Sequence, residues 1–145
     1  MAIPKICGIE TEYAIIQPKI DEQNPIHASS VLVNAYAKQA EVSPNSGVAY
    51  TVEWDFNEET PGNDARGLAP IGSLPPLVET HLVNAVLENG ARFYVDHAHP
   101  EISTPECIDA LQVVKYDRSG EKILEKAMSL ANEVLPPGEE VIVYK

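Results

Sequence analysis

Two segments of the chain alternate between polar and apolar side chains in the way of a β-strand with one charged face. In residues 3–16, Glu10 and Glu12 fall on one face, and the other face is largely apolar. In residues 92–96, Arg92, Tyr94 and Asp96 share a face. Carboxylates that share a face repel one another unless a cation or an arginine lies between them. Both segments therefore predict strands that hold cations or anionic ligands. The simpler alternatives are a solvated edge strand for the first and a structural Arg–Asp ion pair for the second.

The rest of the chain predicts helices, one long loop and a final strand. Helical spacing and cap residues indicate a short helix capped by Ser29 or Ser30, a helix over about 77–87, one from Thr104 and Pro105 to about 116, and one over about 121–135. Residues 117–120 are expected to form a turn, and residues 141–144 begin a strand. Because the chain stops inside that strand, we expect residues 1–145 to be the N-terminal portion of one catalytic domain.

Residues 41–76 are rich in Pro and Gly and predict a long loop. Five carboxylates fall in residues 53–64 without one Lys or Arg. Over the whole chain, 22 Asp and Glu against 10 Lys and Arg give a net charge of −12, which argues against nucleic acid as a partner. A non-catalytic module whose acidic loop binds a basic partner is one hypothesis that fits this charge.

The two cysteines, Cys7 and Cys107, lie far apart in the sequence and form no CxxC motif, which is typical of a reducing compartment. No apolar run is long enough to span a bilayer. The sequence therefore predicts a cytoplasmic protein without a membrane partner.

Residues 96–101, Asp-His-Ala-His-Pro-Glu, concentrate possible metal ligands at the end of the second strand. His97 and His99 with Asp96 could serve a zinc-dependent hydrolase. Alternatively, Glu10, Glu12 and Glu101 could supply the oxygen ligands that Mg²⁺ prefers, often together with substrate phosphates. A guanidinium such as that of Arg92 binds phosphate, and a carboxylate such as Asp96 can act as a nucleophile or a general base.

Three motifs follow one another along the chain: Gly-Ile-Glu-Thr-Glu-Tyr at 8–13, Asn-Gly-Ala-Arg-Phe-Tyr-Val-Asp at 89–96, and His-Pro-Glu at 99–101 followed by Thr-Pro-Glu-Cys at 104–107. In this order they resemble the motifs of the Pup ligase/depupylase family, whose members attach or remove the prokaryotic ubiquitin-like protein Pup. The resemblance implies an α+β fold, the N-terminal part of a glutamine synthetase-like domain with a curved antiparallel sheet packed with helices. The acidic loop and the short connection from Asp96 to His99 resemble the deamidase/depupylase branch rather than the ligase branch.

The resemblance also implies roles for individual residues. Asp96 would be the catalytic carboxylate, Arg92 and Thr104 would contact the phosphates of ATP, and Mg²⁺ would be held by Glu10, Glu12, Tyr94 and Glu101. The expected reaction is ATP- and Mg²⁺-dependent deamidation of the C-terminal Gln of Pup and cleavage of the Pup–lysine isopeptide bond, with Pup and pupylated proteins as partners. A Pup–protein ligase is the alternative within the family. Ile102 and Leu68 depart from the usual residues of the family at their positions.

Overall fold

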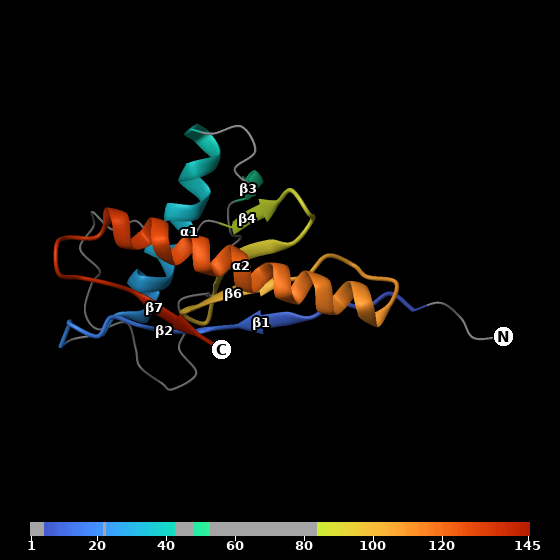
Figure 1. Ribbon diagram of the computed structural model, residues 1–145, viewed down its shortest axis with the longest axis horizontal. Coiled ribbons are helices and arrows are strands. Elements are labelled where there is room, and N and C mark those ends of the chain that lie inside the picture. Colours follow the sequence, from blue (N-terminus) through green and yellow to red (C-terminus); the bar gives the residue numbers. More distant parts are fainter. Residues whose placement is uncertain (1–4, 22, 43–47, 53–83) are drawn as a thin grey trace, which may run out of the picture.

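The computed structural model describes residues 5–21, 23–42, 48–52 and 84–145. Seven strands and two helices lie in these ranges: β1 Glu10–Glu12, β2 Ala14–Ile16, α1 Pro25–Val42, β3 Val48–Val52, β4 Asn84–Leu87, β5 Arg92–Asp96, β6 His99–Ser103, α2 Ala110–Val134 and β7 Ile142–Tyr144. A five-stranded antiparallel sheet has the order β1-β6-β5-β4-β3, and β2 pairs with β7 in a second sheet (Figure 1). The predicted α+β class with an antiparallel sheet is confirmed.

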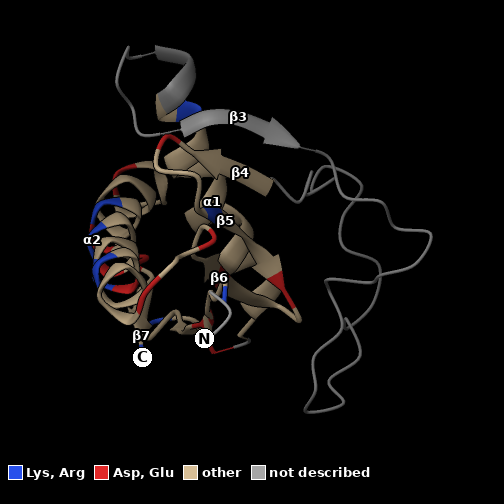
Figure 2. Cartoon of the chain, turned by 90° about the vertical axis from the view of Figure 1, so that its right-hand side faces the viewer, with Lys and Arg blue, Asp and Glu red and all other residues tan. Residues whose placement is uncertain are grey.

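The core lies between the large sheet and the two helices. Phe93 and Ile102 are opposite each other on β5 and β6, and both are almost completely buried. The ring of Phe93 meets the ring of Tyr36 on α1 edge to face, with centroids 5.9 Å apart. Leu124 and Ala127 of α2 complete the same cluster. The sheet therefore has one face covered by helices, and Figure 2 shows α2 along one side of β4, β5 and β6.

The predicted strand over residues 3–16 is interrupted at Tyr13, and its residues 3 and 4 lie outside the described ranges. Before Tyr13, β1 pairs with β6; after it, β2 pairs with β7. The buried Tyr13 donates its backbone N–H to the carbonyl of Pro100, at 2.9 Å. The bond lies where the chain passes from one sheet to the other, and alternation in the sequence does not reveal this change.

The first helix begins earlier than its predicted cap. It starts at Pro25, and the side chain of Asn24 accepts a hydrogen bond from the backbone N–H of His27 at 3.0 Å. Ser29 lies inside the helix and donates to the carbonyl of Ala98 at 2.8 Å. The prediction of Ser29 or Ser30 as the cap was wrong because a buried serine hydroxyl here satisfies a distant carbonyl instead.

The predictions for residues 41–87 are partly wrong and partly outside the described residues. Strand β3 lies within the expected loop, whereas residues 43–47 and 53–83, with the acidic segment, are not described. Residues 84–87 form strand β4 instead of the end of a helix. Short apolar runs fit either periodicity, and here pairing with β3 and β5 decides in favour of the strand.

Helix α2 is one continuous helix, in place of two predicted helices and a turn. Its N-cap is Asp109, whose side chain accepts from the N–H of Gln112 at 2.8 Å. The predicted start at Thr104 was wrong because residues around it stay extended: Thr104 pairs with Ile9, and Cys107 pairs with Cys7. The helix also continues through residues 117–120, where a turn was predicted. Among the described residues, no helix is both long and apolar enough to cross a membrane.

Gly120 brings α2 close to the sheet, so we expect substitutions there to destabilise the protein. A Cβ atom at Gly120 would lie 3.2 Å from Cγ2 of the buried Ile102. Alanine favours a helix over glycine by about 1 kcal/mol, but overpacking costs roughly 1–3 kcal/mol, so Gly120→Ala should lose about 1 kcal/mol net. Urea denaturation measures the loss. The matched change Ser129→Ala on the exposed side of α2 should be neutral or slightly stabilising; a gain from Gly120→Ala would contradict the close contact.

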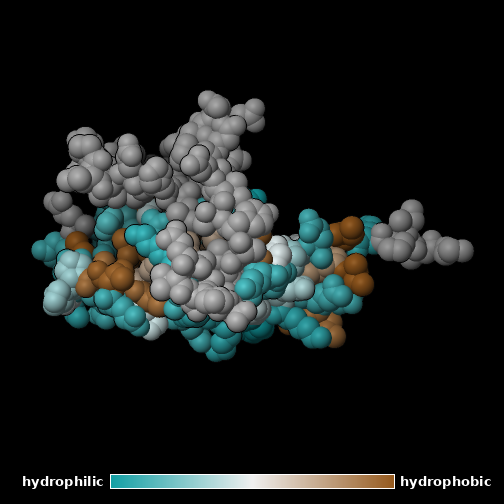
Figure 3. Space-filling model, turned by 90° about the horizontal axis from the view of Figure 1, so that it is seen from above, coloured by the Kyte–Doolittle hydropathy of each residue, from teal (hydrophilic) through white to brown (hydrophobic). Residues whose placement is uncertain are grey.

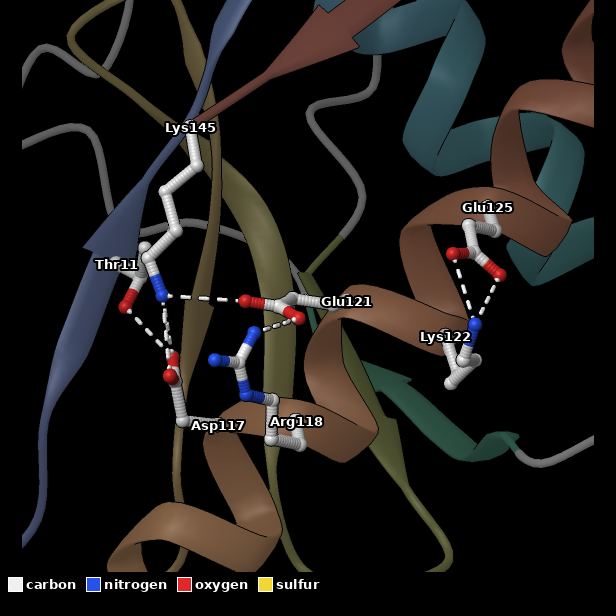
Figure 4. A network of polar contacts seen from close by, with 7 residues as sticks. All are labelled: Thr11, Asp117, Arg118, Glu121, Lys122, Glu125 and Lys145. Carbon is white, nitrogen blue, oxygen red and sulfur yellow. Dashed lines mark hydrogen bonds and ion pairs between the residues drawn. The ribbon is translucent and has the colours of Figure 1, made fainter.

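A network of charged groups joins the end of β7 to α2 and β1 (Figure 4). Lys145 Nζ lies 3.0 Å from both carboxylate oxygens of Asp117 and 3.5 Å from Glu121. Thr11 donates to Asp117 at 3.4 Å, and Arg118 pairs with Glu121. The network fixes the helix-facing side of β1, and the opposite side of this strand carries Glu10 and Glu12.

Candidate functional site

The strand register brings the charged side chains together on the face of the sheet opposite the helices. Arg92, Tyr94 and Asp96 of β5 stand opposite three polar residues of β6, namely Ser103, Glu101 and His99. On the other side of β6, Glu10 pairs with Ser103 and Glu12 with Glu101. Because side chains alternate between faces, residues that pair across the register share a face. One face of the sheet therefore carries Glu10, Glu12, Arg92, Tyr94, Asp96 and Glu101 together.

A chain of hydrogen bonds crosses three strands at this face. The hydroxyl of Tyr94 donates to Glu101 Oε1 at 2.6 Å and lies 2.8 Å from the hydroxyl of Ser103. Ser103 in turn donates to Glu10 Oε1 at 3.3 Å. Burial, together with the hydrogen bond to Glu101, raises the pKa of Tyr94 well above its usual value. Tyr94 is thus a neutral donor that fixes the orientation of Glu101.

Glu101 is a carboxylic acid in an unfavourable place for a negative charge. Its side chain is 3% exposed. Burial raises the pKa of Glu101 to about 7; the hydrogen bond from Tyr94 opposes this, and the charges of Asp96, Glu10 and Glu12 add to the increase. Such a group is stabilised by any cation that neutralises the shared negative charge.

We expect Glu101→Gln to stabilise the metal-free protein at high pH. The folded-state pKa lies above the usual value of 4.5. The native state therefore binds the Glu101 proton more tightly than the unfolded chain does. The resulting contribution to the free energy of unfolding is fully present below pH 4.5 and is lost as the pH rises through 7. The neutral glutamine avoids that loss and should gain about 1–3 kcal/mol above pH 8.

Urea denaturation in a chelator at several pH values tests this expectation. The two proteins should differ at pH 8 and converge near pH 4. A difference that does not change with pH would contradict the proposed origin of the effect.

Arg92 is positioned by a residue that the sequence did not suggest. Its Nε donates to the side-chain oxygen of Asn84 at 3.2 Å, and its guanidinium carbon lies 5.0 Å from the centre of the Tyr94 ring. Asn84 is 2% exposed and belongs to β4. This residue was missed because residues 77–87 were predicted as a helix. Ser103 was also missed, although its place two residues after Glu101 on a strand was a usable signal.

A tight hairpin with unusual backbone angles places Asp96 and His99. Between β5 and β6 only two residues intervene, and both have positive φ: 43° at His97 and 70° at Ala98. Positive φ at both loop residues is characteristic of a type I′ turn, and it costs a residue other than glycine roughly 1–2 kcal/mol. The hydrogen bond from Ser29 to the Ala98 carbonyl supports the turn from the helix side. His97 Nδ1 then lies 3.0 Å from Asp96 Oδ2.

The histidines of the site do not converge on one point. His99 Nδ1 lies 3.5 Å from Glu12 Oε2, and His97 contacts Asp96. Among the described residues, one group has ligand atoms all within 4.8 Å of one another, and it consists of Glu12, Asp96 and His97. This group has two carboxylates and a single histidine, and so is richer in oxygen than most zinc sites.

Thr104 is joined to the strand before β1 rather than to the carboxylates. Its hydroxyl accepts the N–H of Ile9 at 3.0 Å, and its own N–H donates to the Ile9 carbonyl at 2.9 Å. A Cβ atom at Gly8 would lie 3.2 Å from this hydroxyl oxygen. The printed hydrogen bonds of Thr104 thus join it to Ile9 and not to the carboxylates of β1, β5 and β6.

Comparison with known proteins identifies the family. A family model described as "Pup-ligase protein" matches residues 5–145. The chain belongs to the Pup ligase family. It is 41% identical over 146 residues to the Pup deamidase/depupylase of Mycobacterium tuberculosis (strain CDC 1551 / Oshkosh), an alignment that covers 97% of this chain and 28% of the relative. The chain thus spans just over a quarter of the length of that curated relative.

The Pup–protein ligase relatives align with a shorter part of this chain than the deamidase/depupylase relatives do. The Pup–protein ligase of Kineococcus radiotolerans is 49% identical over 66 residues, 43% of this chain and 15% of the ligase. Among solved structures, the complex between Pup and its ligase PafA superimposes with a TM-score of 0.56 at 19% identity, covering 98% of this chain and 22% of that chain. At this identity the likeness establishes the fold alone, and it agrees with the antiparallel sheet and helices described above.

Proposed function

We propose that this chain is the N-terminal portion of the catalytic domain of an ATP- and Mg²⁺-dependent hydrolase that deamidates the C-terminal Gln of Pup and cleaves the Pup–lysine isopeptide bond. The observation that carries the proposal is the face shared by Arg92, Asp96 and Glu101 with Glu10 and Glu12. The branch within the family is supported by the relatives, because those named deamidase/depupylase match over 97% of the chain and the ligases over less than half. The reaction would take place in the cytoplasm.

The acidic side of this face suits Mg²⁺. Its donors are carboxylate oxygens, and the raised pKa of buried Glu101 reflects negative charge that a cation would neutralise. Glu10, Glu12 and Glu101 would hold the metal. Tyr94 belongs to the same site through its hydrogen bond to Glu101. When bound, Mg²⁺ would neutralise phosphate and carboxylate charge at this face.

Arg92 and Thr104 are the proposed contacts for the phosphates of ATP. Asn84 and the Tyr94 ring hold the guanidinium of Arg92 at the same face as the carboxylates. A planar guanidinium with several donors suits phosphate oxygens. The hydroxyl of Thr104 accepts from Ile9, so its own proton can be donated to a ligand.

Asp96 is proposed as the catalytic carboxylate. Its side chain is 28% exposed, at the end of β5, and His97 Nδ1 contacts one of its oxygens. The other oxygen can attack the carbonyl carbon of the Pup amide, whose nitrogen takes a proton from water and leaves as ammonia or the lysine amine. Alternatively, the same oxygen can take a proton from an attacking water. Single turnover in ¹⁸O-labelled water followed by peptide mass analysis tests the nucleophilic role: label in Asp96 requires an acyl intermediate that water opens at the aspartyl carbonyl.

The decisive test uses the complete encoded protein with ATP, Mg²⁺ and Pup ending in Gln. Conversion of this Gln to Glu, and release of Pup from a Pup–lysine conjugate, are the expected results. Conjugation of Pup ending in Glu to protein lysines without deamidation would favour the ligase. Activity that needs stoichiometric zinc and no nucleotide would favour the zinc-dependent hydrolase. Binding of a basic partner without any turnover would favour a non-catalytic interaction module.

A further inference from the structure

The two cysteines, 100 residues apart in the sequence, are direct partners in the fold. They form an isolated antiparallel bridge just before β1 and just after β6. Cys7 N–H donates to the Cys107 carbonyl at 2.9 Å, and Cys107 N–H donates to the Cys7 carbonyl at 2.7 Å. Residues that exchange both backbone bonds have Cα atoms about 5.5 Å apart, within the range that a disulfide spans. Both cysteines are free thiols in this structure.

The two thiols differ in accessibility and chemistry. Cys7 is exposed, whereas Cys107 is completely buried. Burial raises the pKa of the Cys107 thiol, and a negative charge on Cys7 raises it further. Cys107 is therefore a poor first target for an oxidant, because the thiolate is the reactive form. The sequence neighbours of the two cysteines, Ile6 and Ile108, are 70% and 73% exposed, and Figure 3 shows apolar surface at the right-hand end of the described residues.

We propose that Cys7 is a site of reversible oxidation and that Cys107 resolves it as a Cys7–Cys107 disulfide. In the first step a hydroperoxide oxidises the Cys7 thiol to a sulfenic acid, and the hydroperoxide is reduced to water or an alcohol. In the second step the Cys107 sulfur attacks the Cys7 sulfur, and hydroxide and the Cys107 proton leave as water. A cellular dithiol returns both cysteines to thiols and is itself oxidised to a disulfide.

The backbone pairing explains why such a bond would be reversible. Cβ atoms of opposite residues on antiparallel strands lie roughly 4.5–5.5 Å apart, and a relaxed disulfide needs about 3.8 Å. A pair that exchanges both backbone bonds lies at the wide end of this range, so the two Cβ atoms must approach by roughly 1.5–2 Å. Strain of this kind makes a disulfide easier to reduce. In a reducing compartment the dithiol would be the resting form. This inference does not depend on the proposed Pup-directed activity.

The test treats the complete encoded protein with hydrogen peroxide, blocks the remaining thiols and analyses tryptic peptides without reduction. Residues 6–19 and 93–115 should appear as one linked species, two hydrogen atoms lighter than the sum of its parts, and dithiothreitol should separate them. In Cys107→Ser, dimedone should trap Cys7 as a sulfenic acid. In Cys7→Ser, Cys107 should remain a thiol at the same peroxide dose.

Two controls keep the inference open to refutation. Linkage in the folded protein should be at least tenfold faster than in protein unfolded with urea, because folding holds the two segments opposite each other. Equal rates, full alkylation of both cysteines after peroxide, or rapid oxidation of Cys107 in Cys7→Ser would each overturn the proposal. Circular dichroism of the two serine variants excludes unfolding as the cause of any change.

Discussion

Asp96→Asn is expected to lower kcat for Pup deamidation by about 10³-fold, the scale of a lost general base or nucleophile. Asparagine keeps the size and shape of the side chain but can neither attack a carbonyl nor accept a proton. It can still accept the hydrogen bond from the His97 ring, so the hairpin should keep its geometry. Initial rates at saturating Pup, with ATP and Mg²⁺ present, measure the effect.

The matched control is Asp21→Asn, the same chemical change at an exposed bend. Its kcat should equal that of the unsubstituted protein. KM for Pup should change little in Asp96→Asn, because the proposal gives Asp96 a part in the chemical step. Activity within tenfold of normal in a folded Asp96→Asn protein would remove Asp96 from the reaction.

Phe93→Ala is expected to lower the free energy of unfolding by about 4 kcal/mol. Phe93 is 0% exposed and meets Tyr36 edge to face. Alanine would leave a cavity between β5 and α1 and remove the aromatic contact. Urea denaturation followed by circular dichroism measures the loss.

Two comparisons separate a cavity from a general sensitivity to substitution. Phe93→Leu retains most of the apolar volume and should cost about 1 kcal/mol. Val134→Ala, at a side chain that is 69% exposed, should change stability by less than about 0.5 kcal/mol. Similar losses from Phe93→Ala and Phe93→Leu would contradict the tight packing of this part of the core.

Much of the candidate site could be predicted because strand alternation is a local property. Arg92, Tyr94 and Asp96 share a face in any straight strand, and so do Glu10 and Glu12. Their convergence could not be predicted from periodicity alone, because it depends on β6 lying between β1 and β5 in a particular register. The same register brings Ser103 to the hydroxyl of Tyr94, and β4 brings Asn84 to the guanidinium of Arg92.

The sequence by itself determined the strand over 92–96, the final strand, the α+β class and, through its motifs, the family. Tertiary structure alone decided the continuous α2. Asp117 to Gly120 looks like a turn, because glycine and aspartate disfavour helix interiors. In the fold Gly120 gains close contact with Ile102, and Asp117 pairs with Lys145, 28 residues away. Local preferences of about 1 kcal/mol are outweighed when distant residues supply packing and charge, and a single segment of sequence does not contain those partners.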